Sequence, residues 1–219
     1  MAKPQITLYI DIVSPFGYLA FYALRNFPVF KACDITYVPI LLGGVMKDVG
    51  NRPPFTVKNK DTWIAKERTR WQKTFSIPML TGMPPKFPAN TVLVQRALTH
   101  VFLTTPSATA DAAAACFEAY WVKGLDITEP TVVHAALEKA LGPKEAGDAL
   151  EGAKSVRAKE ELGRLSKGAV NEGAFGLPYF VATNAKGEKE TFWGFDHLGQ
   201  VCRHLEIDMP REGGWRSVL

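Results

Sequence analysis

Ser14 is the residue best suited to chemistry in this 219-residue chain, because it lies where a predicted strand meets a predicted helix, in the segment Ser14-Pro15-Phe16-Gly17-Tyr18. A serine followed by a proline is typical of a helix N-cap with the proline in the first turn. Unpaired backbone N–H groups and the helix dipole make such a position favourable for a thiolate or another anion. Ser14 is therefore either a plain helix cap or the hydrogen-bond donor of an anion site. Evidence from other parts of the sequence is needed to distinguish these two interpretations.

The elements that must position Ser14 are a strand before it and a helix after it. Apolar residues alternate in the first and recur at helical spacing in the second, at Ile6, Leu8, Ile10 and Ile12 and then at Leu19, Phe21, Tyr22 and Leu24. Residues 34–41 predict a second strand, so the chain opens as a βαβ unit with a parallel pair and a right-handed crossover. The glycines and paired prolines of residues 43–54 predict a loop, a common place for function.

Residues 56–173 change character and predict one helix after another, with apolar stripes that indicate a packed core. Strand patterns return at residues 179–183 and 190–193 around a turn, which predicts a hairpin, and Asp196 then opens a last helix. The order is βαβ, a block of helices, and ββα. We therefore predict an α/β fold: a thioredoxin-like domain of residues 1–55 and 174–219, interrupted by an all-helical insertion domain of residues 56–173.

Composition describes an ordinary globular protein, with 47% hydrophobic and 22% charged residues and a formal net charge of +4. The basic residues between Lys58 and Lys73 alternate with acids, which is typical of a solvated helix face and argues against nucleic-acid binding. The cysteines Cys33, Cys116 and Cys202 are far apart and have no metal-ligand spacing, so we expect core thiols, no metal site and no disulfide framework.

The sequence contains only weak signals for the cellular compartment of the protein. A reducing environment is favoured by the cysteines, and no signal peptide or apolar run of transmembrane length occurs, so we expect a cytoplasmic protein without a membrane partner. A mitochondrial or peroxisomal location stays open without a clear targeting signal. The C-terminal Ser-Val-Leu shares only its first and last residues with the peroxisomal Ser-Lys-Leu address.

Pro178 is the second residue of interest, because Gly176-Leu177-Pro178 immediately precedes the hairpin. A proline is tolerated at the start of a strand, where it need not donate to the ladder. In a thioredoxin-type layout this position faces the start of the first helix and is commonly a cis proline. The residue before it can pair its backbone with an extended peptide. The alternative interpretation is a simple loop proline.

Several motifs together resemble the kappa-class glutathione transferases, and more broadly the 2-hydroxychromene-2-carboxylate isomerases and DsbA-type thiol:disulfide oxidoreductases. They follow the family's order and spacing over nearly the whole chain. The matching segments are Asp11-Ile12-Val13-Ser14-Pro15-Phe16, Gly44-Val45-Met46-Lys47-Asp48-Val49-Gly50-Asn51-Arg52-Pro53-Pro54, Asp126-Ile127-Thr128-Glu129-Pro130, Gly173-Ala174-Phe175-Gly176-Leu177-Pro178 and Trp193-Gly194-Phe195-Asp196-His197. The resemblance implies a glutathione site in the thioredoxin domain beneath the insertion, and usually a homodimer.

The resemblance also implies roles for single residues. Ser14 would hydrogen-bond the glutathione sulfur and favour its thiolate, so that the reactive sulfur belongs to the ligand. Asn51 would contact glutathione, Lys60 would pair with the glycyl carboxylate, Leu177 would bond the cysteinyl backbone, and Asp196 would bind the γ-glutamyl ammonium. Phe16, Pro178 and Phe195 complete the implied binding site as neighbours of these residues.

Two departures from the family pattern affect this site. Phe195 and His197 flank Asp196 where the family usually has a small polar residue and an arginine, and losing a charge-assisted bond costs about 1.5–3 kcal/mol. Phe16-Gly17 replaces the usual Tyr-Ser or Tyr-Ala and removes one hydrogen-bond donor. We therefore expect weaker affinity for glutathione than is usual in the family.

The leading hypothesis is a glutathione transferase that adds the thiolate to a small hydrophobic electrophile, with peroxide reduction as a related use of that thiolate. Alternatives are a glutathione-dependent isomerase of the chromene-carboxylate kind and a non-catalytic thioredoxin-fold binding protein. Disulfide exchange is the poorest option, because no second cysteine stands near Ser14. The sequence does not identify the electrophile. Aromatic residues near Trp63 and Trp71 offer more apolar surface than one helix needs, which favours a homodimer.

Overall fold

A four-stranded sheet lies at the centre of the computed structural model, which describes residues 2–218. The strands follow the order β2-β1-β3-β4 in the sheet. Their bounds are Gln5–Ile10 for β1, Asp34–Pro39 for β2, Tyr179–Thr183 for β3 and Lys189–Trp193 for β4. β1 pairs with β2 in parallel and with β3 in antiparallel fashion, and β3 and β4 form an antiparallel hairpin. The predicted βαβ and ββα halves therefore meet at the β1–β3 pair.

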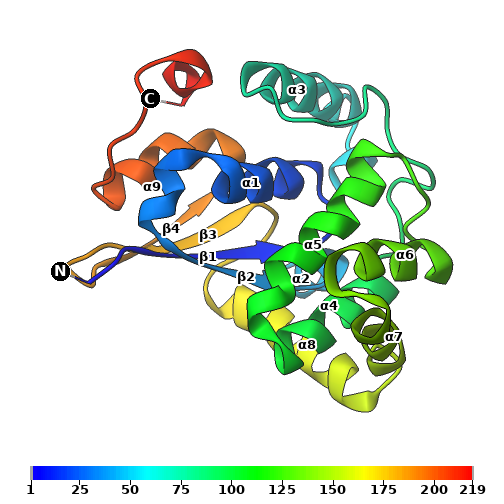
Figure 1. Cartoon of the computed structure of the whole chain (residues 1–219). Coiled ribbons are helices and arrows are strands. Elements are labelled where there is room, and N and C mark those ends of the chain that lie inside the picture. Colours follow the sequence, from blue (N-terminus) through cyan, green and yellow to red (C-terminus); the bar gives the residue numbers. More distant parts are fainter. Residues whose placement is uncertain (1, 219) are drawn as a thin grey trace.

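Helices cover both faces of this sheet (Figure 1). Side chains alternate along each strand, so one set packs toward α1 and α9 and the other toward α2 and α8. The helices of the thioredoxin-like part are α1 (Pro15–Asn26), α2 (Leu42–Asp48) and α9 (Leu198–His204). Short single-turn helices at Pro28–Ala32, Pro54–Thr56, Phe195–His197 and Gly213–Ser217 join or follow them.

Between α2 and β3 the described part of the chain forms six further α-helices, in agreement with the predicted block of helices. They are α3 (Lys60–Thr74), α4 (Val92–Thr104), α5 (Thr109–Phe117), α6 (Pro130–Leu141), α7 (Pro143–Gly152) and α8 (Val156–Asn171). α4 to α8 form one packed group, whereas α3 lies apart from them near the C-terminal segment (Figure 1). The boundaries proposed at residues 55/56 and 173/174 stay a prediction.

Two local predictions were wrong. Residues 43–54 are not entirely a loop, because α2 occupies Leu42–Asp48 and only the remainder is irregular. The amide of Leu42 donates to the Asp11 carboxylate at 2.8 Å, a tertiary contact that anchors the helix start despite its two glycines. Asp196 does not open an α-helix directly, because it lies in a single 3₁₀ turn that precedes α9.

The cysteines behave as the sequence predicts. Cys33, Cys116 and Cys202 are all buried and unpaired. Burial raises the pKa of Cys116 and of Cys202 to about 12. Within residues 2–218 no helix is both long enough and apolar enough to cross a membrane. The last residue of the C-terminal Ser-Val-Leu lies outside the described residues.

Candidate active site

Ser14 is the N-cap of α1, as the sequence predicts, and it is nearly buried. Its Oγ accepts a hydrogen bond from the amide of Gly17 at 3.0 Å. A hydroxyl that accepts one bond still has its proton to donate, and within residues 2–218 no acceptor takes that proton. Pro15 has no N–H, so the Phe16 amide is the other donor of the first turn without a partner in the described chain.

Gly17 makes this cap compact, which the sequence analysis treated only as the loss of a donor. A Cβ at position 17 would lie 2.9 Å from the Cβ of Ser14 and 3.1 Å from its Oγ. Either approach is too close for an unaltered serine rotamer. Glycine therefore lets Ser14 sit directly over the first turn of α1, with its hydroxyl beside the positive end of the helix.

The turn before Ser14 is fixed by a buried carboxylate that the sequence analysis did not single out. Asp11 is fully buried and accepts hydrogen bonds from the Val13 amide at 3.1 Å, the Thr91 hydroxyl at 2.7 Å and the Leu42 amide at 2.8 Å. Burial raises the pKa of Asp11 to about 6, and these three bonds oppose the rise. One side chain thus ties the Ser14 turn to both α2 and α4.

Two further side chains of the insertion hold the same turn. Gln95 donates to the carbonyls of Ile10 at 2.8 Å and Ile40 at 2.6 Å. The indole N–H of Trp121 donates to the carbonyl of Ile12 at 2.8 Å. The polar atoms of both side chains therefore bond the backbone at the end of the strand that leads to Ser14.

Leu177 and Pro178 lie at the start of β3, and the peptide bond between them is cis. Within residues 2–218 the backbone N–H and C=O of Leu177 have no hydrogen-bond partner. Such a free pair of backbone groups can bond an extended peptide as an added strand. The neighbouring Phe175 and Trp193 rings are about half exposed and lie 4.8 Å apart, forming an aromatic ledge beside this segment.

Asn51 and Asp196 are brought to the Leu177–Pro178 segment from opposite sides. The side-chain amide of Asn51 donates to the carbonyl of Phe175 at 2.7 Å. The amide of Gly194 donates to the carbonyl of Pro178 at 3.0 Å, and the turn that carries Asp196 contacts α1. The Asp196 carboxylate is 59% exposed, so it is accessible to a cation in solution.

Phe195 and Lys60 differ from the other predicted site residues. The Phe195 side chain is 1% exposed and packs against Trp71 and Phe75, so only its backbone is available to a ligand. Lys60 is exposed at the first position of α3, and no carboxylate pairs with it among residues 2–218. The structure therefore links Asn51 and the turn that carries Asp196 to the residues around Leu177 and Pro178, while Lys60 lies on a separate helix, α3.

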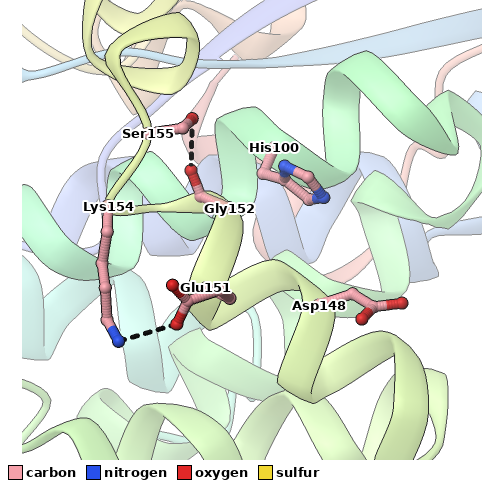
Figure 2. A pocket seen from close by; sticks show the side chains of 6 residues that line it. All are labelled: His100, Asp148, Glu151, Gly152, Lys154 and Ser155. Atoms are coloured by element: carbon pink, nitrogen blue, oxygen red, sulfur yellow. Dashed lines mark hydrogen bonds and ion pairs between the residues drawn. The ribbon is translucent and has the colours of Figure 1, made fainter.

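One hollow on the surface lies elsewhere. It is an open cavity of about 570 Å³ between α4 and the end of α7 (Figure 2), lined by His100, Asp148, Glu151, Gly152, Lys154 and Ser155. Its one cation, Lys154, is already paired with Glu151 at 2.7 Å, and the Ser155 hydroxyl bonds the Gly152 carbonyl. These polar groups satisfy one another, so the Ser14 region is the better candidate for chemistry.

Known proteins resemble this chain over most of its length. The profile of the DSBA-like thioredoxin domain matches residues 5–206. Human glutathione S-transferase kappa 1 is 30% identical over 207 residues, which cover 91% of this chain and 89% of the human protein. The glutathione S-transferase kappa 1 of Caenorhabditis elegans is 26% identical and covers 94% of this chain and 93% of its own length.

Solved structures share the fold. A 2-hydroxychromene-2-carboxylate isomerase superposes with a TM-score of 0.72 at 22% identity and covers 91% of this chain and 96% of the isomerase. The cytosolic disulfide reductase DsbM from Pseudomonas aeruginosa, in a structure with GSH, superposes with a TM-score of 0.63 at 13% identity, over 92% of this chain and 96% of the reductase.

Proposed function

The chain belongs to the glutathione S-transferase kappa family, built on a DSBA-like thioredoxin domain, and on that premise we propose that it binds glutathione as a thiolate over Ser14 and transfers it to a small hydrophobic electrophile. The observation that carries this proposal is the pair of unused donors at the start of α1. They are the Ser14 hydroxyl and the Phe16 amide, and both lie at the positive end of a twelve-residue helix.

These donors favour the thiolate over the thiol for a simple reason. A free thiol has a pKa of about 8.5, so only a few per cent is ionised at neutral pH. A hydrogen bond to a charged sulfur contributes about 1.5–3 kcal/mol, and the helix field adds about 0.3–1 kcal/mol. Together they would lower the pKa of the bound thiol by roughly one to three units. Catalysis needs no cysteine of the protein in this scheme.

The rest of the tripeptide finds complementary groups on this surface. The free backbone of Leu177 would pair with the cysteinyl residue, and Asn51 stands beside the same segment. Asp196 would take the γ-glutamyl ammonium, and Lys60 the glycyl carboxylate. His197 lies 3.5 Å from the Asp196 carboxylate through its Nδ1. This Nδ1 makes no hydrogen bond among the described residues, and we expect weak ammonium binding because Phe195 and His197 stand where the family usually has a small polar residue and an arginine.

Ser14→Ala tests the proposal, because it removes the hydroxyl and keeps the helix. We expect transfer to an aryl halide at neutral pH to fall by about tenfold to a hundredfold and to recover as the pH is raised. The ultraviolet absorbance of the bound thiolate, followed against pH, should move to higher pH in the variant. Coincident titration curves in parent and variant would reduce Ser14 to a helix cap.

Ser155→Ala provides a matched control. Ser155 caps α8 in the same way, by accepting a hydrogen bond from the Ala158 amide at 3.1 Å. Loss of either cap should lower the free energy of unfolding by about 1 kcal/mol. Only Ser14→Ala should also change the thiolate titration, so the pair separates the loss of a cap from the loss of a sulfur ligand.

Product analysis distinguishes the transferase from the alternatives. A thioether adduct of increased mass supports transfer, whereas a rearranged product of unchanged mass would indicate a glutathione-dependent isomerase. No thermal shift with millimolar glutathione would favour a non-catalytic binding protein. The aromatic ledge of Phe175 and Trp193 offers an apolar surface for an electrophile beside the Leu177 backbone.

We also propose that the protein is a homodimer. Large apolar side chains are exposed on and around the loop before α3, namely Val49, Phe55, Val57 and Trp63. Trp71, which the sequence analysis counted among the surplus aromatics, is instead packed against Phe75 and Phe195. Light scattering should give twice the chain mass of 24.1 kDa, and a monomer mass across a wide range of concentration would contradict the proposal.

A further inference from the structure

Helix α3 is weakly anchored for an element that carries a proposed ligand-binding residue. Of its fifteen residues, all of them in the described part of the chain, Arg68 alone is buried. The helix lies beside α1 and the C-terminal segment, apart from the other helices of the insertion (Figure 1). A helix with so few buried apolar contacts opens at low free energy unless something else holds it.

An aromatic cluster at the C-terminal end of α3 provides that hold. Phe75 stacks on Phe27 at 5.6 Å and meets Phe195 edge-on at 5.4 Å, and Trp71 meets Phe195 at 5.5 Å. Trp215, from the C-terminal segment, packs edge-on against Phe75 at 5.7 Å. Aromatic pairs of this geometry contribute about 0.5–1.5 kcal/mol each beyond the area they bury. The aromatic cluster of Phe27, Trp71, Phe75, Phe195 and Trp215 therefore attaches α3 to the body of the protein.

The C-terminal segment Gly213–Ser217 fits closely against the last turn of α3. Trp215 is only 8% exposed there. A Cβ at Gly214 would lie 2.7 Å from the carbonyl oxygen of Thr74 and 3.0 Å from the ring of Phe75. The first of these atoms is backbone and cannot turn away. Glycine at 214 is thus required for the segment to lie directly on α3.

Phe195 connects this cluster to the proposed glutathione site, because it is the residue before Asp196. Lys60 stands at the opposite end of α3, about 20 Å away along the helix at 1.5 Å per residue. We propose that Trp215 is a positioning residue, which holds α3 against Phe195 and so fixes Lys60 relative to Asp196 for the two charged ends of glutathione. This inference rests on the proposed function and concerns the same site.

Packing of Gly213–Ser217 against α3 affects the affinity for glutathione by setting the fraction of molecules in which α3 is attached to the body of the protein. When only a fraction of molecules hold α3 in place, the apparent dissociation constant rises by the inverse of that fraction. Ser14 lies on a different helix and is held by Asp11, Gln95 and Trp121. Loss of Trp215 should therefore raise the glutathione concentration needed for half-saturation and leave the rate at saturation unchanged.

Gly214→Ala and Trp215→Ala test this inference, with Trp215→Phe as the conservative variant. We expect the first two to raise the glutathione dissociation constant about fivefold to twentyfold, with kcat at saturation within twofold of the parent, and Trp215→Phe to recover most of the affinity. Amide hydrogen exchange in α3 should accelerate at least tenfold in the first two variants. Gly163→Ala is the matched control, since a Cβ there meets no atom within 4 Å.

A double variant separates positioning of Lys60 from general loosening. Lys60→Ala removes the group that Trp215 is proposed to position, so adding Trp215→Ala should raise the dissociation constant no further. A full additional effect in the Lys60→Ala background would overturn the inference, as would unchanged exchange of α3 in Gly214→Ala.

The same experiment distinguishes failure of the proposed function. If the parent protein does not bind glutathione, the proposed function falls and the positioning of Lys60 falls with it, while hydrogen exchange still shows whether Gly213–Ser217 holds α3. If the parent binds glutathione and Gly214→Ala binds it equally well, the positioning role alone is wrong.

Discussion

Helices α4 and α3 both lie between β2 and β3, yet they are attached to the rest of the protein by different physical means. α4 is buried along one face and bonds the strand ends directly, through Gln95 to Ile10 and Ile40. α3 is mostly exposed and bonds only the neighbouring loop: Arg68 donates to the carbonyls of Leu80 at 3.0 Å and Thr81 at 2.8 Å.

The difference separates two tasks at one site. The surroundings of Ser14 are held by buried hydrogen bonds to backbone groups, which are costly to break and leave little freedom. The Lys60 side is held by a loop and an aromatic cluster, so its position depends on a few surface-near contacts. Chemistry at a sulfur atom requires a fixed donor, whereas a charge at the end of a long lysine side chain tolerates more movement.

Gln95→Leu should break the α4 attachment and have the largest effect on stability. The substitution keeps the volume but leaves the Ile40 carbonyl and the Ile12 amide without a partner among the described residues, and it removes one of the two bonds to the Ile10 carbonyl, which keeps the Ile40 amide as a donor. Each such loss costs about 1–3 kcal/mol, so we expect the free energy of unfolding to fall by about 3–5 kcal/mol. Urea denaturation measures this directly, and a loss below about 1 kcal/mol would show that α4 is held by apolar packing alone.

Asp11→Asn sharpens the comparison through pH. The folded-state pKa of Asp11 is raised to about 6 from 3.8, so the folded protein favours the protonated form. Its contribution to stability is full below about pH 4 and is lost as the pH rises through 6. Relative to the variant, the parent should lose about 3 kcal/mol of unfolding free energy between pH 4 and 7. If the unfolding free energies of the parent and of Asp11→Asn change with pH in parallel, the buried Asp11 carboxyl does not titrate as expected.

Arg68→Met addresses the α3 side and should have a smaller effect. Two carbonyls lose a donor, but a buried guanidinium with no carboxylate partner among residues 2–218 is removed at the same time. Burial lowers the pKa of Arg68, which shows that its charge is disfavoured there. These opposing terms lead us to expect a net loss of about 1–2 kcal/mol in urea denaturation. Arg70→Met, at an exposed position of the same helix, should change stability by less than about 0.5 kcal/mol.

Gln72→Leu gives the smallest expected effect and is the direct counterpart of Gln95→Leu. Gln72 donates one hydrogen bond, to the carbonyl of Met79 at 2.6 Å, at a partly buried position. We expect a loss of about 1 kcal/mol in the unfolding free energy. Equal losses for the two glutamine variants would remove the distinction between the helices.

Much of the fold could be predicted from the sequence because its signals are local. Alternation in residues 6–12 and the hairpin pattern around Asn184 give the strands, and Ser14, Gly142 and Pro143 mark helix ends. Helix α2 was missed because its start depends on Asp11, which lies 31 residues earlier. Such a contact leaves no periodic pattern in the chain.

The main features of the candidate site could be predicted from the sequence, but the residues that pack around them could not. Ser14 as a helix cap follows from local sequence, the cis bond before Pro178 follows from the thioredoxin-type layout, and both are confirmed. The burial of Phe195 was not predictable, because it depends on Trp71 and Phe75, which lie far earlier in the chain. The roles of Lys60 and Asp196 in binding glutathione stay predictions.

The central pairing of β1 with β3 has a consequence for biosynthesis. The end of β1 and the start of β3 are separated by about 170 residues of chain. At a synthesis rate of about 5–20 residues per second, β3 emerges from the ribosome roughly 8–35 seconds after β1. During that interval β1 can pair with β2, while its other edge stays open and the helices of the insertion have time to form. The nascent protein therefore passes through a state with an unpaired strand edge, the kind of surface that chaperones protect from aggregation.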